Sequence, residues 1–300
     1  MNLVLDEKRT APSDTERLRA LRRQGGFFVL GQRTRVRVTG ADRLRYLTGQ
    51  LSNDLRRLVP GEAIPALLLT AKGKLCADVF VWIDGESLIV EAEAALGEAL
   101  VTRLERYAVS DDVAFELLPP SAERCHLFGS ISAGREGLRI SRLGVEGVDV
   151  PSPPNDLPEA KRDEIELLRI ERGLPRWDCE LSGDTLPQEV GLDRIAVDFN
   201  KGCYVGQEVV SRIHSVGRVN RHLCGFIGDF EPSRVGAAIL VDASGRQSGR
   251  LTSAMFHPEL RKTVALGFLH GQTPELSFAL QDESGACLGT AERSQFPLVS

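Results

Sequence analysis

The sequence predicts an α+β protein built of antiparallel sheets with split β-α-β (ferredoxin-like) character, followed by a small C-terminal β-barrel. Three observations carry this prediction. Residues 63–92 alternate short apolar runs with tight turns, the pattern of successive antiparallel strands. Residues 94–109 then place apolar side chains at helical spacing, as a helix crossing a sheet would. After Cys224 only short strand-like runs and turns remain, which favours a small barrel.

The N-terminal part is predicted to hold two helices with two strands between them. Residues 15–23 are charged and match a short basic helix. Residues 27–40 match two short strands around a turn at Gly31. The next helix would carry three leucines on one face, namely Leu44, Leu47 and Leu51.

The middle of the chain begins with three strands, at 63–71, 75–83 and 86–92, which are joined by glycine-containing turns. The helix after them carries Leu96, Leu100, Val101 and Leu104 at apolar positions. Residues 111–118 then predict a further strand. Antiparallel strands crossed by a helix indicate an α+β layer.

A proline-rich connection at 151–158 leads into a helix predicted over about residues 159–172, which ends at Gly173. The polar segment that follows, to about residue 193, has no apolar periodicity, and long polar loops of this kind are more often functional than not. Residues 194–200 place three apolar side chains in alternation, which predicts a strand.

We therefore expect three parts: an N-terminal extension with a short helix (1–24), two interleaved α+β subdomains (25–222) and the barrel (223–300). The net charge of −5 argues against a protein that binds nucleic acid through overall basicity. The N-terminus is charged from residue 6 onward and no apolar run reaches the roughly 20 residues of a membrane span, so we expect a cytoplasmic protein without membrane contact.

Six cysteines are spread along the chain without a C-x-x-C pair, so the usual local signature of a zinc or iron–sulfur site is missing. One of them, Cys203, lies in the polar segment "KGCYVGQE" (201–208). A helix is predicted directly after it, and a helix N-terminus together with Lys201 favours a thiolate, the form that attacks, ligates metal or becomes oxidised. The alternative is a tight glycine turn in which Glu208 only caps the helix.

The segment "KGCYVGQE" resembles the signature of the YgfZ-type proteins, which belong to the superfamily of the glycine-cleavage aminomethyltransferase, or T-protein. Residues 169–193, which run from "RIERGLP" to "LPQEVGLD", resemble the stretch before that signature. Residues 40–55 and 249–269 resemble the family's N-terminal stretch and its C-terminal barrel. The resemblance covers roughly residues 25–295, with the segments in the family's order.

The resemblance implies three domains around a central channel that holds tetrahydrofolate or a derivative. It implies a role in assembling or maintaining iron–sulfur clusters of other proteins, including radical enzymes that thiolate transfer RNA. The family's functional cysteine maps onto Cys203. The residues expected at the ligand are Lys201, Gly202, Tyr204, Gly206, Gln207, Glu208, Arg212, Glu189 and Asp78.

One departure concerns two adjacent aspartates of the aminomethyltransferase. The corresponding segment here is "KGKLCADVF", in which Asp78 remains and Ala77 replaces the other. Asp78 can also be read as an ordinary solvent-facing strand residue. A folate-dependent aminomethyltransferase or demethylase is therefore the alternative function, and a module that only binds folate or presents a thiol to a partner is a third. Arginines at 212–221 can contact phosphates, but a folate's glutamyl tail explains them more simply than nucleic acid does.

Overall fold

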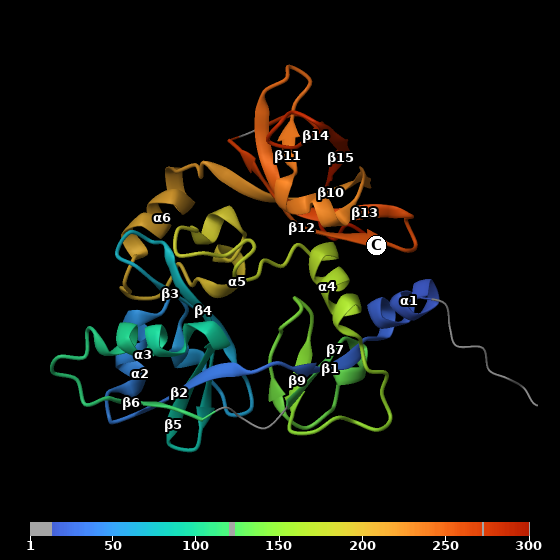
Figure 1. Cartoon of the computed structure of the whole chain (residues 1–300). Helices are drawn as coiled ribbons and strands as arrows, with labels where there is room; N and C mark the ends of the chain where they lie inside the picture. Colours follow the sequence, from blue (N-terminus) through green and yellow to red (C-terminus); the bar gives the residue numbers. More distant parts are fainter. Residues whose placement is uncertain (1–13, 120–123, 272, 300) are drawn as a thin grey trace, which may run out of the picture.

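The structure, a computed structural model, describes residues 14–119, 124–271 and 273–299. Its strands form a five-stranded sheet, a four-stranded sheet and a closed six-stranded barrel, and the strand pairs within each are antiparallel. In Figure 1 the barrel lies above the two sheets, and the loops around α5 (Asp193–Ala196) lie between all three. The predicted α+β class with antiparallel sheets and a C-terminal barrel is confirmed.

The five-stranded sheet contains the three strands predicted over residues 63–92. Its strands are, in sheet order, β3 (Ile64–Leu69), β4 (Leu75–Asp84), β5 (Ser87–Glu93), β2 (Arg33–Thr39) and β6 (Ala114–Leu117). One face packs against α2 (Arg43–Gln50) and α3 (Gly97–Glu105) around a core that includes Val36, Val90 and Leu104. In α2 the predicted apolar face is only partly buried, because Leu47 is enclosed while Leu44 is exposed.

The four-stranded sheet contains only the first of the two strands predicted around Gly31, and the second belongs to the five-stranded sheet. Its strands are, in sheet order, β1 (Gly26–Leu30), β7 (Arg124–Phe128), β9 (Gly147–Val150) and β8 (Leu138–Arg139). Strand β1 pairs with β7, whereas β2 pairs with β5 and β6 of the other sheet. Helices α1 (Asp14–Gln24) and α4 (Arg162–Glu171) share one apolar cluster with β7 and the barrel.

The barrel holds its own core, which includes Phe226, Leu240 and Phe278. Its strands are, in order around the barrel, β10 (Arg221–Phe230), β13 (Lys262–His270), β12 (Gln247–His257), β11 (Ile239–Val241), β14 (Ser277–Gln281) and β15 (Cys287–Ser294). Short 3₁₀ turns complete the described chain: η1 (Leu55–Arg57), η2 (Ala94–Leu96), η3 (Ser130–Ser132), η4 (Pro187–Glu189) and η5 (Pro232–Ala237). Among the described helices, none combines the length and apolar character needed to cross a bilayer.

The strand predicted over residues 194–200 is wrong. Residues 193–196 form the short helix α5, and the chain then continues without a strand partner to the signature segment. Packing explains the difference: Ala196 is buried in an apolar cluster that includes Leu67 and Leu69 of β3, and the Phe199 ring stacks on His214 with centroids 3.8 Å apart. The helix predicted after the signature is confirmed as α6 (Gln207–Val216). The division into three domains stays a prediction.

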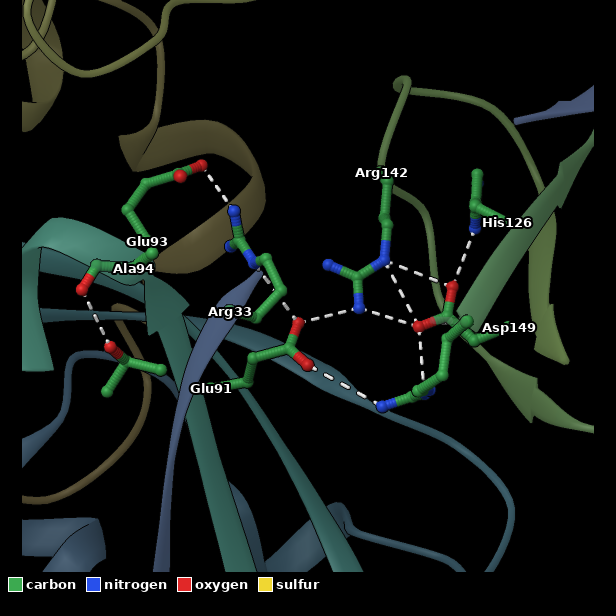
Figure 2. A network of polar contacts seen from close by, with 9 residues as sticks. Arg33, Glu91, Glu93, Ala94, His126, Arg142 and Asp149 are labelled. Atoms are coloured by element: carbon green, nitrogen blue, oxygen red, sulfur yellow. Dashed lines mark hydrogen bonds and ion pairs between the residues drawn. The ribbon is translucent and has the colours of Figure 1, made fainter. Parts of the chain in front are cut away.

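A buried network of charges joins the two open sheets (Figure 2). The Arg142 guanidinium donates to Glu91 on β5 and to Asp149 on β9, each at 2.6 Å. His126 bonds the same Asp149 through Nδ1 at 2.8 Å. Burial opposes ionisation of Asp149, but the hydrogen bonds from His126 and Arg142 outweigh it and lower its pKa to about 2. Burial also lowers the pKa of His126, which keeps its ring neutral.

Candidate functional site

A central cavity of about 580 Å³ opens where the five-stranded sheet, the long polar loop and the barrel meet. Strands β3 and β4 supply one wall, residues 188–196 supply another, and His222 and Leu223 reach it from the barrel. Segments 141–144 and 172–175 close it on the remaining side. Its volume is in the range of sites that hold a small organic molecule.

Asp78 lies on the β4 wall of this cavity. The Trp177 indole Nε1 donates to its Oδ1 atom. Burial raises the pKa of the carboxyl group, although the bond from Trp177 partly offsets it. The reading of Asp78 as an ordinary solvent-facing strand residue is therefore wrong, and its carboxyl group is available to a polar group inside the cavity.

Glu189 lies on the opposite wall, at the end of η4. Its Oε2 atom accepts from Arg221 Nε at 3.0 Å, which ties the polar loop to the first barrel strand. The Arg221 guanidinium also lies 4.3 Å from the centre of the Phe268 ring. Glu189 is thus at the cavity, but one of its oxygens is already committed to a structural ion pair, and its role in ligand binding stays a prediction.

The signature turn lies elsewhere, because the residues that line the central cavity do not include any of positions 201–208. Lys201 is buried, and its Nζ donates to the carbonyl oxygens of Leu51 at 2.6 Å, Asn53 at 3.0 Å and Thr48. These carbonyls belong to the C-terminal end of α2 and the turn after it. Burial lowers the pKa of Lys201 to about 8. Its ammonium therefore binds main chain rather than a ligand, which corrects the sequence-based expectation.

The rest of the turn presents the cysteine to solvent. Cys203 is exposed and lies four residues before the first residue of α6. Tyr204 beside it is buried, which raises its pKa to about 12. Of the two glycines, only Gly206 requires its residue type: it has φ 88°, and a Cβ there would lie 2.6 Å from the Thr70 carbonyl oxygen. Nothing approaches a Cβ built at Gly202.

The polar residues of α6 complete the predicted set. Gln207 begins the helix and is half-buried, while Glu208 and Arg212 are exposed. Neither Glu208 nor Arg212 lines the central cavity. The structure therefore separates the predicted site into two places: Asp78 and Glu189 at the cavity, and the thiol with its helix at the surface.

The comparisons with known proteins identify the relatives. No model of a protein family matches the sequence. The chain is 26% identical over 286 residues to the tRNA-modifying protein YgfZ of Escherichia coli O6:K15:H31, with 82% of this chain and 86% of that protein covered. A protein of Haemophilus influenzae without an assigned role is 28% identical over 240 residues, which covers 76% of this chain and 84% of that protein.

A mitochondrial iron–sulfur cluster assembly factor of Neurospora crassa, an IBA57 homologue, is 24% identical over 273 residues, which covers 80% of this chain and 61% of that protein. The aminomethyltransferase T of the Bartonella henselae glycine cleavage system shares the fold, with a TM-score of 0.76, 18% identity, and 94% and 89% of the two chains covered. The chain is thus similar in sequence to YgfZ-type proteins, and it shares the fold of the aminomethyltransferase T.

Sequence reasoning missed the arginines of the cavity. Arg172 and Arg194 both line it, and no carboxylate ion pair to either is found among the described residues. Burial lowers the pKa of Arg172, whose Nη1 donates only to the Leu143 carbonyl oxygen at 3.2 Å. The segment "RIERGLPRW" contains Arg172, but nothing in the local pattern separates it from its charged neighbours.

The cavity thus combines the carboxyl groups of Asp78 and Glu189, two arginines without carboxylate partners among the described residues, and apolar walls that include Leu67 and Val79. Such a set can bind a ligand that has N–H donors at one end and carboxylates at the other. The described residues hold no group of three or more His, Cys, Asp or Glu side chains arranged to bind a metal ion.

Proposed function

We propose that this protein binds a reduced folate in the central cavity and uses Cys203 in the assembly or repair of iron–sulfur clusters in client proteins. The cavity carries the proposal, because three parts of the fold enclose it and its polar groups are complementary to a folate. The relatives support the second half, since one is named as a tRNA-modifying protein and another as an iron–sulfur cluster assembly factor.

The residues of the cavity fit a folate. Trp177 uses one oxygen of Asp78, which leaves the other to accept from the ring N–H and amino groups of a pterin. Arg172 and Arg194 would pair with the carboxylates of the glutamyl part, and such guanidinium–carboxylate bonds are among the stronger hydrogen bonds. A bound reduced folate would supply either a one-carbon unit or reducing equivalents.

The position of Cys203 favours an action on another protein. Its side chain is exposed at a turn that precedes α6, where another protein can reach it. A single thiolate cannot hold a cluster alone, because clusters usually need four protein ligands. Any contact of Cys203 with a cluster would therefore be shared with cysteines of the client, and transfer-RNA-modifying radical enzymes are clients of that kind.

A folate-dependent aminomethyltransferase or demethylase is the second candidate. The position of Asp78 in the cavity favours it, because this is the aspartate retained from the pair of the aminomethyltransferase. Ala77 is buried on the other side of the strand and offers no carboxylate. Turnover of an N-methyl or aminomethyl donor with tetrahydrofolate would support this candidate, and its absence at saturating substrate would remove it.

The proposed function is tested by complementation. A strain that lacks the corresponding YgfZ-type gene is supplied with wild-type protein, Cys203→Ser or Cys287→Ser, and the activity of iron–sulfur enzymes is measured. Cys287 is the matched control, because it is the other exposed cysteine of the described chain. We expect wild type and Cys287→Ser to restore activity and Cys203→Ser to fail at equal protein levels. Full restoration by Cys203→Ser would contradict the proposal.

A further inference from the structure

A second cavity, of about 520 Å³, lies on the face of the five-stranded sheet that turns away from α2 and α3. It shares no lining residue with the central cavity. Its floor is made of neighbouring side chains on β4, β5 and β2, because Trp82 pairs with Ile89 and Ile89 pairs with Arg37. Three arginines line it, namely Arg35, Arg37 and Arg124.

The arginines come from a strict alternation on β2. Arg33, Arg35 and Arg37 point to this face, while the residues between them are buried on the opposite face. Three parallel cations on one strand repel one another unless anions lie between them. The sequence thus concentrates positive charge on this face, and the location of the carboxylates decides which arginine stays uncompensated.

Glu91 is the residue directly opposite Arg35 on β5, but its carboxylate is already occupied by other guanidinium groups. It accepts from Arg142 at 2.6 Å and lies 3.5 Å from Arg33 and 3.6 Å from Arg124. Figure 2 shows Glu91 between Arg33 and Arg142. This one carboxylate is thus shared by three arginines, and no ion pair between it and Arg35 is found among the described residues.

The other carboxylates of the cavity serve Arg37. Glu116 accepts from its Nη1 at 2.9 Å, and Asp84 lies 3.9 Å from its Nη2. Arg124 bonds Asp149 at 3.0 Å, with its guanidinium 5.8 Å from the centre of the Trp82 ring. No carboxylate pairs with Arg35 among the described residues, and its Nε is a buried donor without a hydrogen-bond partner.

A buried donor without a partner is uncommon in folded proteins and points to a missing water, ion or ligand. Burial and the nearby positive charge of Arg124 lower the pKa of Arg35, so the surroundings penalise the charged guanidinium. An anion in the cavity would offset both penalties by favourable interaction with the charged guanidinium. A phosphate matches the guanidinium fork, which can donate two parallel hydrogen bonds to it.

The cavity is larger than an inorganic phosphate requires, and Trp82, Ile89 and Leu138 give it apolar surface. We propose that this second cavity binds a phosphorylated ligand with a planar body, of the mononucleotide type, whose phosphate pairs with Arg35. The planar body would lie against the apolar surface beside Trp82. The proposal is independent of the folate proposal, because the two cavities have no residue in common.

The test is calorimetric titration of the full chain at low salt with adenosine 5′-monophosphate, inorganic phosphate and adenosine. We expect the monophosphate to bind more tightly than either of its parts. Arg35→Gln should weaken its binding about tenfold or more, because the charge-assisted hydrogen bonds to the phosphate are lost. Arg234→Gln is the matched control: it removes one charge from a half-exposed barrel residue and should leave binding unchanged.

Arg35→Lys separates charge from geometry and also serves if Arg35→Gln does not fold. It retains the positive charge without the planar fork, so we expect affinity for the monophosphate between those of wild type and Arg35→Gln. Absence of monophosphate binding to wild type at millimolar concentration would overturn the proposal. Equal binding by wild type and both Arg35 variants would also overturn it, as would inorganic phosphate binding as tightly as the monophosphate.

Discussion

Replacement of Lys201 by methionine should destabilise the fold rather than remove a ligand contact. The substitution retains most of the side-chain volume and removes the ammonium, which leaves the carbonyl oxygens of Thr48, Leu51 and Asn53 without their shared donor. Buried carbonyl oxygens without partners are costly. The bonds from Lys201 also hold the signature segment against the C-terminal end of α2. Stability and the order of the Cys203 turn should therefore fall together.

The magnitude follows from two opposing terms. Hydrogen bonds to a charged group contribute about 1.5–3 kcal/mol each, so three of them contribute roughly 4.5–9 kcal/mol. Against this stands the cost of burying the ammonium, which the lowering of its pKa from 10.5 to about 8 places at about 3 kcal/mol. The difference is about 1–6 kcal/mol, and we expect the free energy of unfolding to fall by about 3 kcal/mol.

The assay is urea unfolding at neutral pH, with Lys72→Met as the matched control. Lys72 is exposed on the turn before β4, so its replacement should change the free energy of unfolding by less than about 0.5 kcal/mol. A loss below about 1 kcal/mol in Lys201→Met, or the same loss in both variants, would refute the structural role given to Lys201.

Three further predictions concern the turn, the buried network and the thiol. Gly206→Ala should lower the free energy of unfolding by about 2 kcal/mol or more, because φ is 88° and the new Cβ would meet the main chain, whereas Gly202→Ala should be nearly neutral; equal effects in urea unfolding would contradict this. Asp149 has its pKa lowered from 3.8 to about 2, so it contributes about 2 kcal/mol of stability above pH 4 that is lost as the pH falls toward 2. Between pH 6 and pH 2 the free energy of unfolding should therefore fall by about 2 kcal/mol less in Asp149→Asn than in wild type. Equal decreases in the two proteins would contradict the role given to the ion network. In the folded protein, Cys203→Ser should lower by one the number of thiols that a polar disulfide reagent modifies rapidly, since Cys203 is exposed; an unchanged count would show that the thiol is not accessible.

Local patterns were sufficient to predict those elements whose structure depends on their own residues. The strands at 64–93 and the helices α3 and α6 follow from apolar periodicity and turn residues within short windows. The strand predicted at 194–200 failed because three alternating apolar residues are too few to distinguish a strand from a packed loop. Pairing was also beyond local reasoning, since β1 and β2 are consecutive but belong to sheets whose other strands lie far along the chain.

The candidate site was predicted in part for the same reason. The sequence could place Cys203 before a helix, because both features lie within ten residues. It could not show that Lys201 would meet carbonyl oxygens about 150 positions away, or that Trp177 would cover one oxygen of Asp78. It also could not separate the thiol from the cavity, because that separation depends on how three parts of the fold meet.

The central claim is that a folate binds in the cavity beside Asp78 while Cys203 acts at the surface. Calorimetric titration with tetrahydrofolate under anaerobic conditions tests this claim most directly. Wild type and Cys203→Ala should bind with the same affinity, and Asp78→Asn should bind about tenfold or more weakly, because the substitution replaces one of the two carboxyl oxygens by an amide N–H donor. Loss of binding in Cys203→Ala with full binding in Asp78→Asn would contradict the account.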